Sequence, residues 1–184
     1  MILFRRRDDP YGLIVGMTGV KLGDRVVQIG CAHGGRLASI AGRVGLSGRA
    51  VAIVPDSPSA TRARKGAAQA GVFVELEIAP PGRLPLEDGA FDLAVIDDTA
   101  GLLATMPDDG RMAAIHEALR ALRPGGRVMV IGSGPRRGFG SLLSSGSKGP
   151  RFDPGPSLEA GGFGPARTLA EREGLAFVEA IKPR

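Results

Sequence analysis

Five short apolar runs alternate with helical stretches along the first two thirds of this chain. The runs lie at residues 25–29, 50–54, 72–78, 91–96 and 127–131. Runs of this length that are rich in β-branched residues and bounded by Gly or Pro are typical of strands buried on both faces of a sheet. We therefore predict an α/β fold of three layers, in which a mostly parallel sheet with right-handed crossovers carries helices on both faces.

The stretches between these runs carry the signals of helix ends. Helices are expected at about 36–44, 57–70 and 109–122. Ser57-Pro58 offers an N-cap followed by a proline at the first helical position, and Gly71 stands where that helix should end. The resulting β-α-β-α rhythm is that of a mostly parallel sheet.

The C-terminal part of the chain changes in character. Residues 132–156 are crowded with Gly, Ser, Pro and Arg, which predicts a flexible surface loop; a loop that covers a substrate would have the same composition. A short helix is expected next, and two runs that flank Glu173-Gly174 predict a C-terminal antiparallel hairpin. Since no linker is long enough to divide the chain, we expect one domain over residues 1–184, with a short N-terminal segment at 1–20.

The composition limits the partners and the compartment. The net charge is +5, but the basic residues are spread along the chain and are not interleaved with its few aromatic side chains, which are one Tyr and seven Phe with no Trp. Single-strand binders stack bases on aromatics beside a basic groove, so we do not expect a nucleic-acid partner. One Cys and two His make neither an intrachain disulfide nor a convincing metal site. No apolar run approaches the ~20 residues of a membrane span, and the N-terminal charges follow the apolar residues, unlike those of a signal peptide. We therefore expect a cytoplasmic chain.

The loop after the first strand is the first candidate for ligand binding. Residues 25–29 run into Gly30-Cys31-Ala32-His33-Gly34-Gly35, which opens the next helix. In an open parallel sheet, ligands bind beyond the carboxyl ends of the strands, and small residues there let backbone N–H groups approach an anionic ligand. Taken alone, this pattern predicts either a cofactor loop or a tight turn made for packing.

Three segments in order carry a family resemblance. They are residues 22–31 (LGDRVVQIGC), 84–92 (LPLEDGAFD) and 121–127 (ALRPGGR). In these segments the chain resembles class I S-adenosylmethionine-dependent methyltransferases of the small-molecule type, similar to the methyltransferase type 11 group. The resemblance covers about residue 21 to the C-terminus. It implies a seven-stranded Rossmann-like sheet with an antiparallel last strand, S-adenosylmethionine as the cofactor and a small molecule as the methyl acceptor.

The resemblance also implies which residues hold the cofactor. They are Gln28, Gly30, Cys31, Ala32, Gly34, Val54, Pro55, Asp56, Pro80 and Pro81. Three of these positions carry an acid in the family and are neutral here: Gln28, Val54 at the ribose and Pro80 near the adenine. Because a carboxylate on a ribose diol receives charge-assisted hydrogen bonds, losing several acids should weaken cofactor binding by roughly a few kcal/mol.

Two nearby side chains offer partial compensation. Asp56, two residues after Val54, either swings toward the ribose or serves only as an acid at the start of a helix. Gln28 can still hydrogen-bond the amino-acid end of the cofactor, directly or through water. An acid introduced at Val54 is expected to tighten cofactor binding.

Asp97, Asp98 and His33 are the candidate catalytic residues. The two acids end the fourth strand, where the pocket of the family opens, and they either face the reacting groups or start the following loop. His33 either lines the pocket as a hydrogen-bond donor or faces solvent. Cys31 is interpreted as a small loop residue rather than a nucleophile, because no His is fixed beside it by the sequence.

The sequence is consistent with three functions from different classes. The first is a methyltransferase in which positioning does most of the catalysis, because the methyl donor is already activated. The second is a binding or scaffold protein that keeps the fold but binds the cofactor weakly or not at all, working as a homodimer or as the partner of an active enzyme. The neutral cofactor positions and the short N-terminal segment favour the second. A third hypothesis admits another adenosine-containing or smaller ligand.

Overall fold

The strands form one seven-stranded sheet in the order β3-β2-β1-β4-β5-β7-β6. The computed structural model describes residues 11–134 and 152–184. The strands are β1 (Arg25–Ile29), β2 (Arg49–Val54), β3 (Glu75–Ile78), β4 (Phe91–Asp97), β5 (Leu122–Ser133), β6 (Arg167–Arg172) and β7 (Leu175–Ile181). The pairs among β1 to β5 are parallel, and β7 runs antiparallel to both β5 and β6. The predicted α/β sheet and its C-terminal hairpin are confirmed, and β1 lies inside the sheet between β2 and β4.

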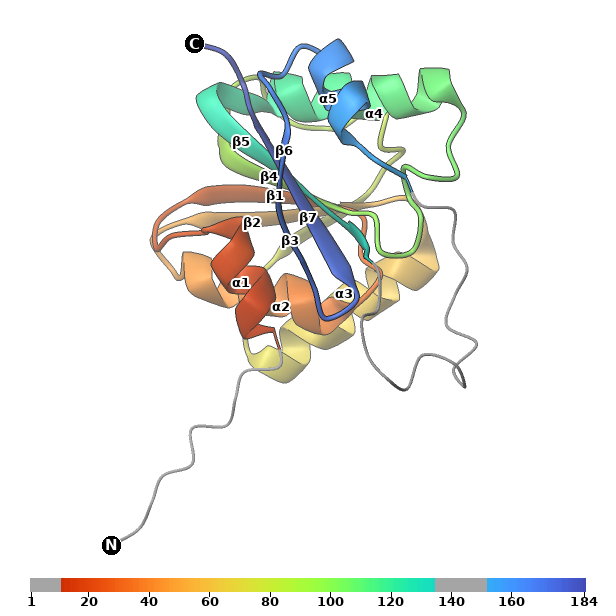
Figure 1. The fold of residues 1–184 in the computed structure, drawn as a ribbon. Coiled ribbons are helices and arrows are strands. Elements are labelled where there is room, and N and C mark those ends of the chain that lie inside the picture. Colours follow the sequence, from red (N-terminus) through yellow and green to blue (C-terminus); the bar gives the residue numbers. More distant parts are fainter. Residues whose placement is uncertain (1–10, 135–151) are drawn as a thin grey trace, which may run out of the picture.

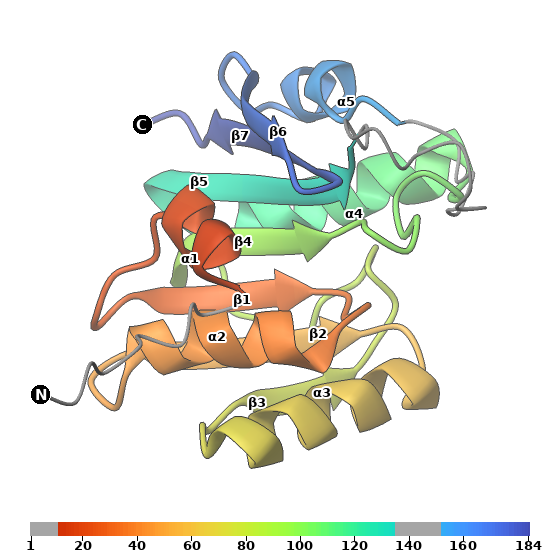
Figure 2. The same ribbon diagram turned by 60° about the horizontal axis from the view of Figure 1, so that its bottom comes forward.

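Helices cover both faces of this sheet (Figure 1, Figure 2). They are α1 (Gly12–Thr18), α2 (Gly34–Val44), α3 (Ser57–Ala70), α4 (Asp108–Ala121) and α5 (Gly155–Ala160). Helices α1, α2 and α3 lie on one face, and α4 and α5 lie on the other. Helices α2, α3 and α4 begin and end within two residues of the predicted bounds.

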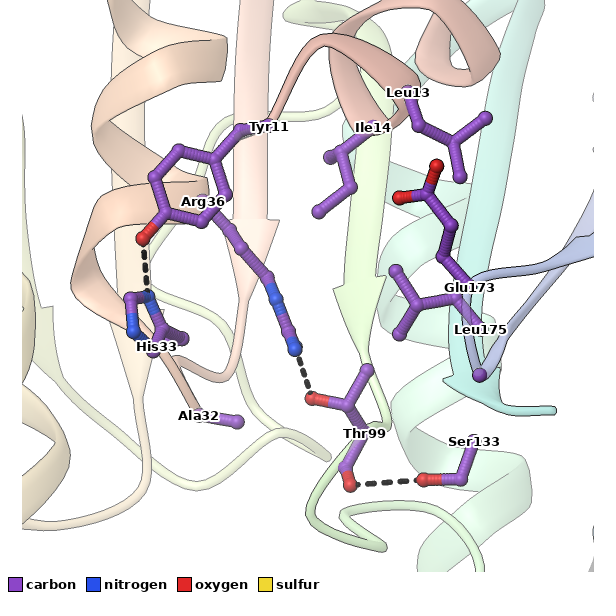
Figure 3. Close-up of a pocket in the computed structure, with 11 residues that line it drawn as sticks. Tyr11, Leu13, Ile14, Ala32, His33, Arg36, Thr99, Ser133, Glu173 and Leu175 are labelled. Atoms are coloured by element: carbon purple, nitrogen blue, oxygen red, sulfur yellow. Dashed lines mark hydrogen bonds between the residues drawn. The ribbon is translucent and has the colours of Figure 1, made fainter. Parts of the chain in front are cut away.

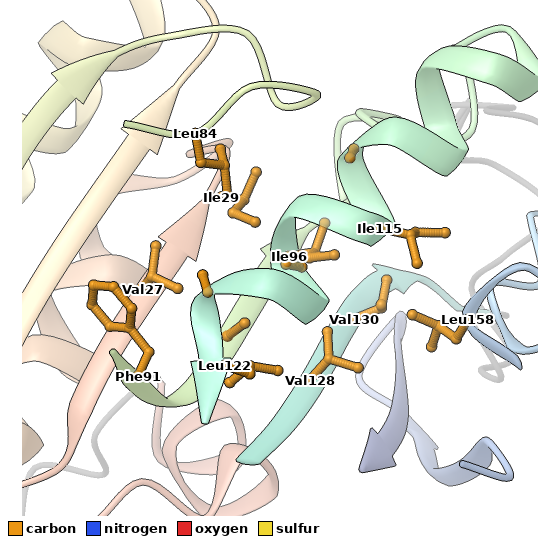
Figure 4. Packing of buried hydrophobic residues seen from close by; sticks show 14 of the residues in the cluster. Val27, Ile29, Leu84, Phe91, Ile96, Ile115, Leu122, Val128, Val130 and Leu158 are labelled. Carbon is orange, nitrogen blue, oxygen red and sulfur yellow. The ribbon is translucent and has the colours of Figure 1, made fainter. Parts of the chain in front are cut away.

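The core on the α4 and α5 side is built from alternate residues of the central strands (Figure 4). Side chains on this face are fully buried: Val27, Ile29, Ile96, Val128, Val130, Ile115 of α4 and Leu158 of α5. Because successive strand residues point to opposite faces, the neighbours Val26 and Gln28 point to the α2 side. The continuous apolar runs in the sequence therefore reflect strands that are covered on both faces of the sheet.

Helix α1 was not predicted. It carries Ile14, which is buried against Val26 and Phe177 of the sheet and Ile40 of α2. Its sequence signal is weak, because seven residues give only two helical turns and the N-cap Tyr11 makes no side-chain capping bond. Packing against the sheet, rather than a local signal, accounts for this helix, which lies beside the edge where the candidate site is found.

Several predicted boundaries differ from the structure; β5, for example, begins at Leu122 instead of residue 127. Only Glu75–Ile78 of the run 72–78 is a strand, because Val72 donates its N–H to Ala67 and still belongs to the end of α3. The predicted loop 132–156 is shorter at both ends, since β5 continues to Ser133 and α5 begins at Gly155. Its centre, residues 135–151, lies outside the described residues, and so does the first half of the N-terminal segment.

Candidate functional site

The loop after β1 makes a tight turn beneath the loop that follows β4. Gly30 has a φ of 81°, which only glycine adopts readily, and its N–H donates to the carbonyl oxygen of Ile53 at 2.8 Å. A Cβ built on Gly30 would lie 2.9 Å from Cδ2 of Leu102 and 3.2 Å from the carbonyl oxygen of Asp97. Glycine is therefore required here both by the turn and by the close approach of the second loop.

Asp97 joins these two loops. One oxygen of its carboxylate accepts the N–H of Ala32 at 2.9 Å, and the other accepts the hydroxyl of Thr99 at 2.6 Å. The guanidinium of Arg36 lies 3.7 Å from the second oxygen and donates to the Thr99 hydroxyl at 2.6 Å. Asp97 is 3% exposed. Both of its oxygens are thus occupied, one by the loop of Ala32 and the other by the loop that follows β4.

The carboxylate of Asp98 does not bind the loop of Ala32 but the backbone of residues that follow β4. One of its oxygens accepts the N–H groups of Leu103 at 2.6 Å and Ala104 at 3.3 Å. Burial raises the pKa of this carboxyl above its usual value. It lines a separate cavity of about 290 Å³ beside β5, with Ser133 and Phe152 among the other lining residues. Asp97 lines a different cavity, described below, so Asp97 and Asp98 do not share one centre.

His33 is exposed and caps helix α2. Its Nδ1 accepts the N–H of Gly35 at 3.2 Å, and the hydroxyl of Tyr11 lies 3.3 Å from the same nitrogen. In a neutral imidazole whose Nδ1 accepts, the proton resides on Nε2, so His33 offers an N–H donor to its surroundings. The three candidate catalytic residues are therefore not brought together in one place.

Two cavities flank the loop of Ala32. The first, which we name the β2 pocket, holds about 300 Å³. Its lining residues are Gly30, Cys31, Ala32, Pro55, Asp56, Ser59, Arg62, Asp97, Ala100, Gly101, Leu102, Thr105 and Met106. The residues come from the carboxyl ends of β1, β2 and β4 and from the start of α3, which is the edge where the ligands of parallel sheets bind.

The second cavity, which we name the hairpin pocket, holds about 420 Å³ on the α1 side of the same edge (Figure 3). Its lining residues are Tyr11, Leu13, Ile14, Ala32, His33, Arg36, Thr99, Ser133, Glu173, Gly174 and Leu175. Ala32 lines both cavities. A ligand that passes Ala32 would therefore extend from one cavity into the other.

Half of the predicted cofactor residues line the β2 pocket, namely Gly30, Cys31, Ala32, Pro55 and Asp56. The others line neither this pocket nor the hairpin pocket. Two of them are the prolines: Pro80 is exposed beyond β3, and Pro81 is buried.

Val54 and Gly34 serve packing instead. Val54 is 0% exposed and packs in the apolar cluster of Leu37, Ala60 and Ala63 between the sheet and helices α2 and α3. A Cβ on Gly34 would overlap the carbonyl oxygen of Arg62, so glycine lets α2 and α3 meet. Neither residue lines the β2 pocket or the hairpin pocket, so their assignment to the cofactor stays a prediction that the packing of Val54 and Gly34 does not support.

Gln28 is buried directly behind the turn. Its Nε2 donates to the carbonyl oxygen of Gly30 at 3.0 Å, and it is 2% exposed. Its Oε1 has no hydrogen-bond partner within the part of the chain that the structure describes. A buried acceptor without a donor is costly, so a water or a ligand N–H is expected there.

Asp56 is the N-cap of α3, one residue before the predicted cap Ser57. Its carboxylate accepts the N–H of Ser59 at 2.7 Å, and this backbone hydrogen bond lowers the pKa of Asp56. The side chain is exposed at the rim of the β2 pocket. The role of a helix-start acid is confirmed, and the same carboxylate borders the cavity.

Sequence reasoning missed two arginines in these cavities. Arg62 reaches from α3 to the loop, where its Nε donates to the carbonyl oxygen of Cys31 at 3.0 Å and its Nη2 donates to Ser59 at 2.7 Å. Arg36 lies in the first turn of the helix that follows the loop. In the sequence, this position is the only feature that could have indicated a role for Arg36 at the site. Cys31 is buried, and burial raises the pKa of its thiol to about 11. The thiol is therefore protonated at neutral pH, as suits a small loop residue.

Two kinds of feature are absent from residues 11–134 and 152–184. No helix there is long and apolar enough to cross a membrane. No group of three or more His, Cys, Asp or Glu side chains there is placed to hold a metal ion.

Comparison with known proteins identifies the family. The model of the methyltransferase domain family matches residues 26–126, which is more than half of the chain. This chain therefore belongs to the methyltransferase domain family. S-adenosylmethionine is the cofactor that this membership indicates.

Individual relatives are distant. The chain is 30% identical over 117 residues to 27-O-demethylrifamycin SV methyltransferase of Amycolatopsis mediterranei (strain S699), covering 64% of this chain and 41% of that protein. The crystal structure of a SAM-dependent methyltransferase from Aquifex aeolicus superposes with a TM-score of 0.74 at 19% identity, over 92% of this chain and 87% of that one. The [4+2]-cyclase SpnF superposes with a TM-score of 0.66 at 20% identity, over 93% and 78%. The chain spans 30% and 41% of the length of two curated relatives that it matches.

The residues present fit this cofactor. The two cavities meet at Ala32, the turn at Gly30 leaves no room for a side chain, and Gln28 keeps an unpaired buried acceptor behind the loop. An elongated ligand with an adenosine at one end and a charged amino acid at the other matches a pair of cavities of this size and polarity.

Proposed function

We propose that this chain transfers a methyl group from S-adenosylmethionine to a small molecule. The observation that carries the proposal is the pair of cavities that meet at Ala32, built on the loop that lies inside the matched family segment. In this proposal the adenosine lies in the β2 pocket and the amino-acid end lies in the hairpin pocket. The hairpin pocket is the larger one and leaves room for the acceptor.

Positioning by the chain would supply most of the catalysis. The cofactor, when bound, supplies an activated methyl group on a sulfonium centre. Asp97 holds the loop of Ala32 against the end of β4, and Leu102 lies directly over the turn at Gly30. His33 offers an N–H donor to the methyl acceptor in the hairpin pocket. It would therefore orient the methyl acceptor by a hydrogen bond and would not remove a proton from it.

Titration with S-adenosylhomocysteine, the stable product of the cofactor, tests the proposal. Calorimetry should show one site per chain with a dissociation constant well below about 1 mM, a value that corresponds to about 4 kcal/mol of binding free energy. A wild-type chain that releases no heat at millimolar ligand, and that this ligand does not stabilise against heat, would refute the proposal.

That negative result would favour the second candidate, a binding or scaffold protein that keeps the fold. The neutral side chains at Gln28, Val54 and Pro80 support this candidate, and the similarity to SpnF, a cyclase, supports the view that the fold serves other tasks. Under either candidate we propose a single domain in the cytoplasm. Light scattering would show whether it forms the homodimer that the scaffold hypothesis includes.

Asp56 allows a prediction that separates its two roles. Asp56→Ala should lower the urea midpoint of unfolding at pH 7, because it removes the N-cap of α3. Since the pKa of Asp56 is lowered in the folded chain, its carboxylate stabilises the fold above the unfolded-state pKa of ~3.9, and this contribution is lost as the pH falls through the folded-state pKa.

Asp56→Asn is the matched control, because asparagine caps helices as well as aspartate does. It should leave the urea midpoint nearly unchanged. A loss of affinity for S-adenosylhomocysteine in Asp56→Asn alone would then report the carboxylate at the ribose. Equal affinity in wild type and Asp56→Asn would show that Asp56 acts only as a cap.

A further inference from the structure

Glu173 occupies a backbone conformation that glutamate rarely adopts. The turn between β6 and β7 consists of Glu173 and Gly174, with φ angles of 56° and 76°. Hairpin turns with positive φ at both central residues favour Asn, Asp or Gly at the first position. Glu173 is the one non-glycine residue with positive φ among the described residues. A disfavoured residue held in such a conformation points to a function for its side chain.

The carboxylate of Glu173 enters the hairpin pocket. Figure 3 shows Glu173 and Arg36 reaching this cavity from different sides, one from the hairpin and the other from α2. No hydrogen bond or ion pair joins Glu173 to another described residue. An unpaired negative charge at the wall of a cavity favours a ligand with a positive group.

Arg36 offers the complementary charge. Its Nη1 donates a hydrogen bond to the hydroxyl of Thr99. Its Nε and Nη2 have no acceptor within the described part of the chain. Two adjacent N–H groups of a guanidinium match the two oxygens of a carboxylate. The hairpin pocket therefore presents a carboxylate and a guanidinium to one cavity of about 420 Å³, an arrangement that fits a zwitterion.

We propose that Glu173 and Arg36 hold the α-ammonium and the α-carboxylate at the amino-acid end of the cofactor. This inference rests on the proposed function and adds a specific role for the β6–β7 hairpin. Gln28 is neutral where the resemblance implies an acid, so the loop brings no negative side chain of its own for the ammonium. Glu173, which is distant in sequence, supplies this negative charge. The need for the charge accounts for a glutamate at a turn position whose positive φ is unfavourable for it.

Two substitutions of Glu173 test the proposal by calorimetry and thermal unfolding. Glu173→Gln removes the charge and keeps the size of the side chain. Glu173→Asn also removes the carboxylate from the pocket, but it places a preferred residue in the turn, so its melting temperature should equal or exceed that of the wild type. Both should bind S-adenosylhomocysteine about tenfold or more weakly than the wild type. Loss of affinity together with gain of stability is a combination that a purely structural residue would not give.

The ligand 5′-methylthioadenosine is the control, because it shares the adenosine and the thioether but lacks the amino acid. Its affinity should be the same in wild type and in both variants. Unchanged affinity for S-adenosylhomocysteine in the variants would overturn the role of Glu173 while leaving the proposed function intact. A wild type that binds neither ligand would overturn both. Equal losses for both ligands would also overturn the inference, since they would show a general change of the site.

Discussion

Replacing Gly34 with alanine should lower the free energy of unfolding by about 3 kcal/mol, the upper end of the usual range for overpacking. The new Cβ would overlap the carbonyl oxygen of Arg62, and it would lie 3.1 Å from the Cα of Gly66. These are backbone atoms of α3, so no side-chain rotation relieves the overlap. The better helix propensity of alanine, worth at most about 1 kcal/mol, is too small to offset it.

Gly42→Ala is the matched control in the same helix. A Cβ on Gly42 would meet only Cγ1 of Val72 at 3.5 Å, which is an ordinary contact. This substitution should therefore stabilise the chain by about 0.5–1 kcal/mol through helix propensity alone. Urea unfolding of both variants measures the difference. If Gly34→Ala unfolds at the same urea concentration as the wild type, α2 and α3 are not in backbone contact.

The fold could be predicted from the sequence because its signals are local and repeated. Each central strand is covered on both faces, so it appears as a continuous apolar run, and Gly71 ends its helix as predicted. Helix α1 has no comparable signal, because its stability comes from burying Ile14 against residues of β1, α2 and β7 that lie far apart in the sequence.

The site could be predicted only in part. The loop from Gly30 to Ala32 was found because a glycine-rich turn between a strand and a helix is a local pattern. Glu173 was recognised as part of a turn, but its place in the hairpin pocket depends on β7 pairing with β5, which local sequence does not reveal. The different directions of Asp97 and Asp98 depend on the loop after β4, whose N–H groups at Leu103 and Ala104 bind Asp98, and local sequence does not reveal these contacts.

Val54→Asp shows how the structure reverses an expectation based on alignment. Aligned with the family, an acid at Val54 should bind the ribose and tighten cofactor binding. In the structure Val54 is 0% exposed among Leu37, Ala60 and Ala63, and it does not line the β2 pocket. An aspartate there would be a buried charge without a partner, so we expect a loss of about 3–5 kcal/mol of folding free energy at pH 7.

The pH dependence of this loss identifies its cause. Burial raises the pKa of an unpaired carboxyl, so the carboxyl introduced by Val54→Asp would be more easily protonated in the folded chain than in the unfolded one. The stability of Val54→Asp relative to wild type should therefore be best near pH 4 and fall as the pH rises through the higher folded-state pKa. In the control Val54→Asn, the asparagine has the shape of aspartate but no charge. This variant should be less stable than the wild type by an amount that does not change with pH.

Urea unfolding of wild type and both Val54 variants between pH 4 and pH 8 makes the comparison. A stable Val54→Asp that binds S-adenosylhomocysteine more tightly than the wild type would show that this side chain reaches the ribose after all. The expected result, a pH-dependent loss of stability, instead assigns Val54 to the core. Asp56 and Asp97 are then the carboxylates that border the β2 pocket. Because both oxygens of Asp97 accept hydrogen bonds, from the N–H of Ala32 and the hydroxyl of Thr99, Asp56 is the carboxylate that we propose for the ribose.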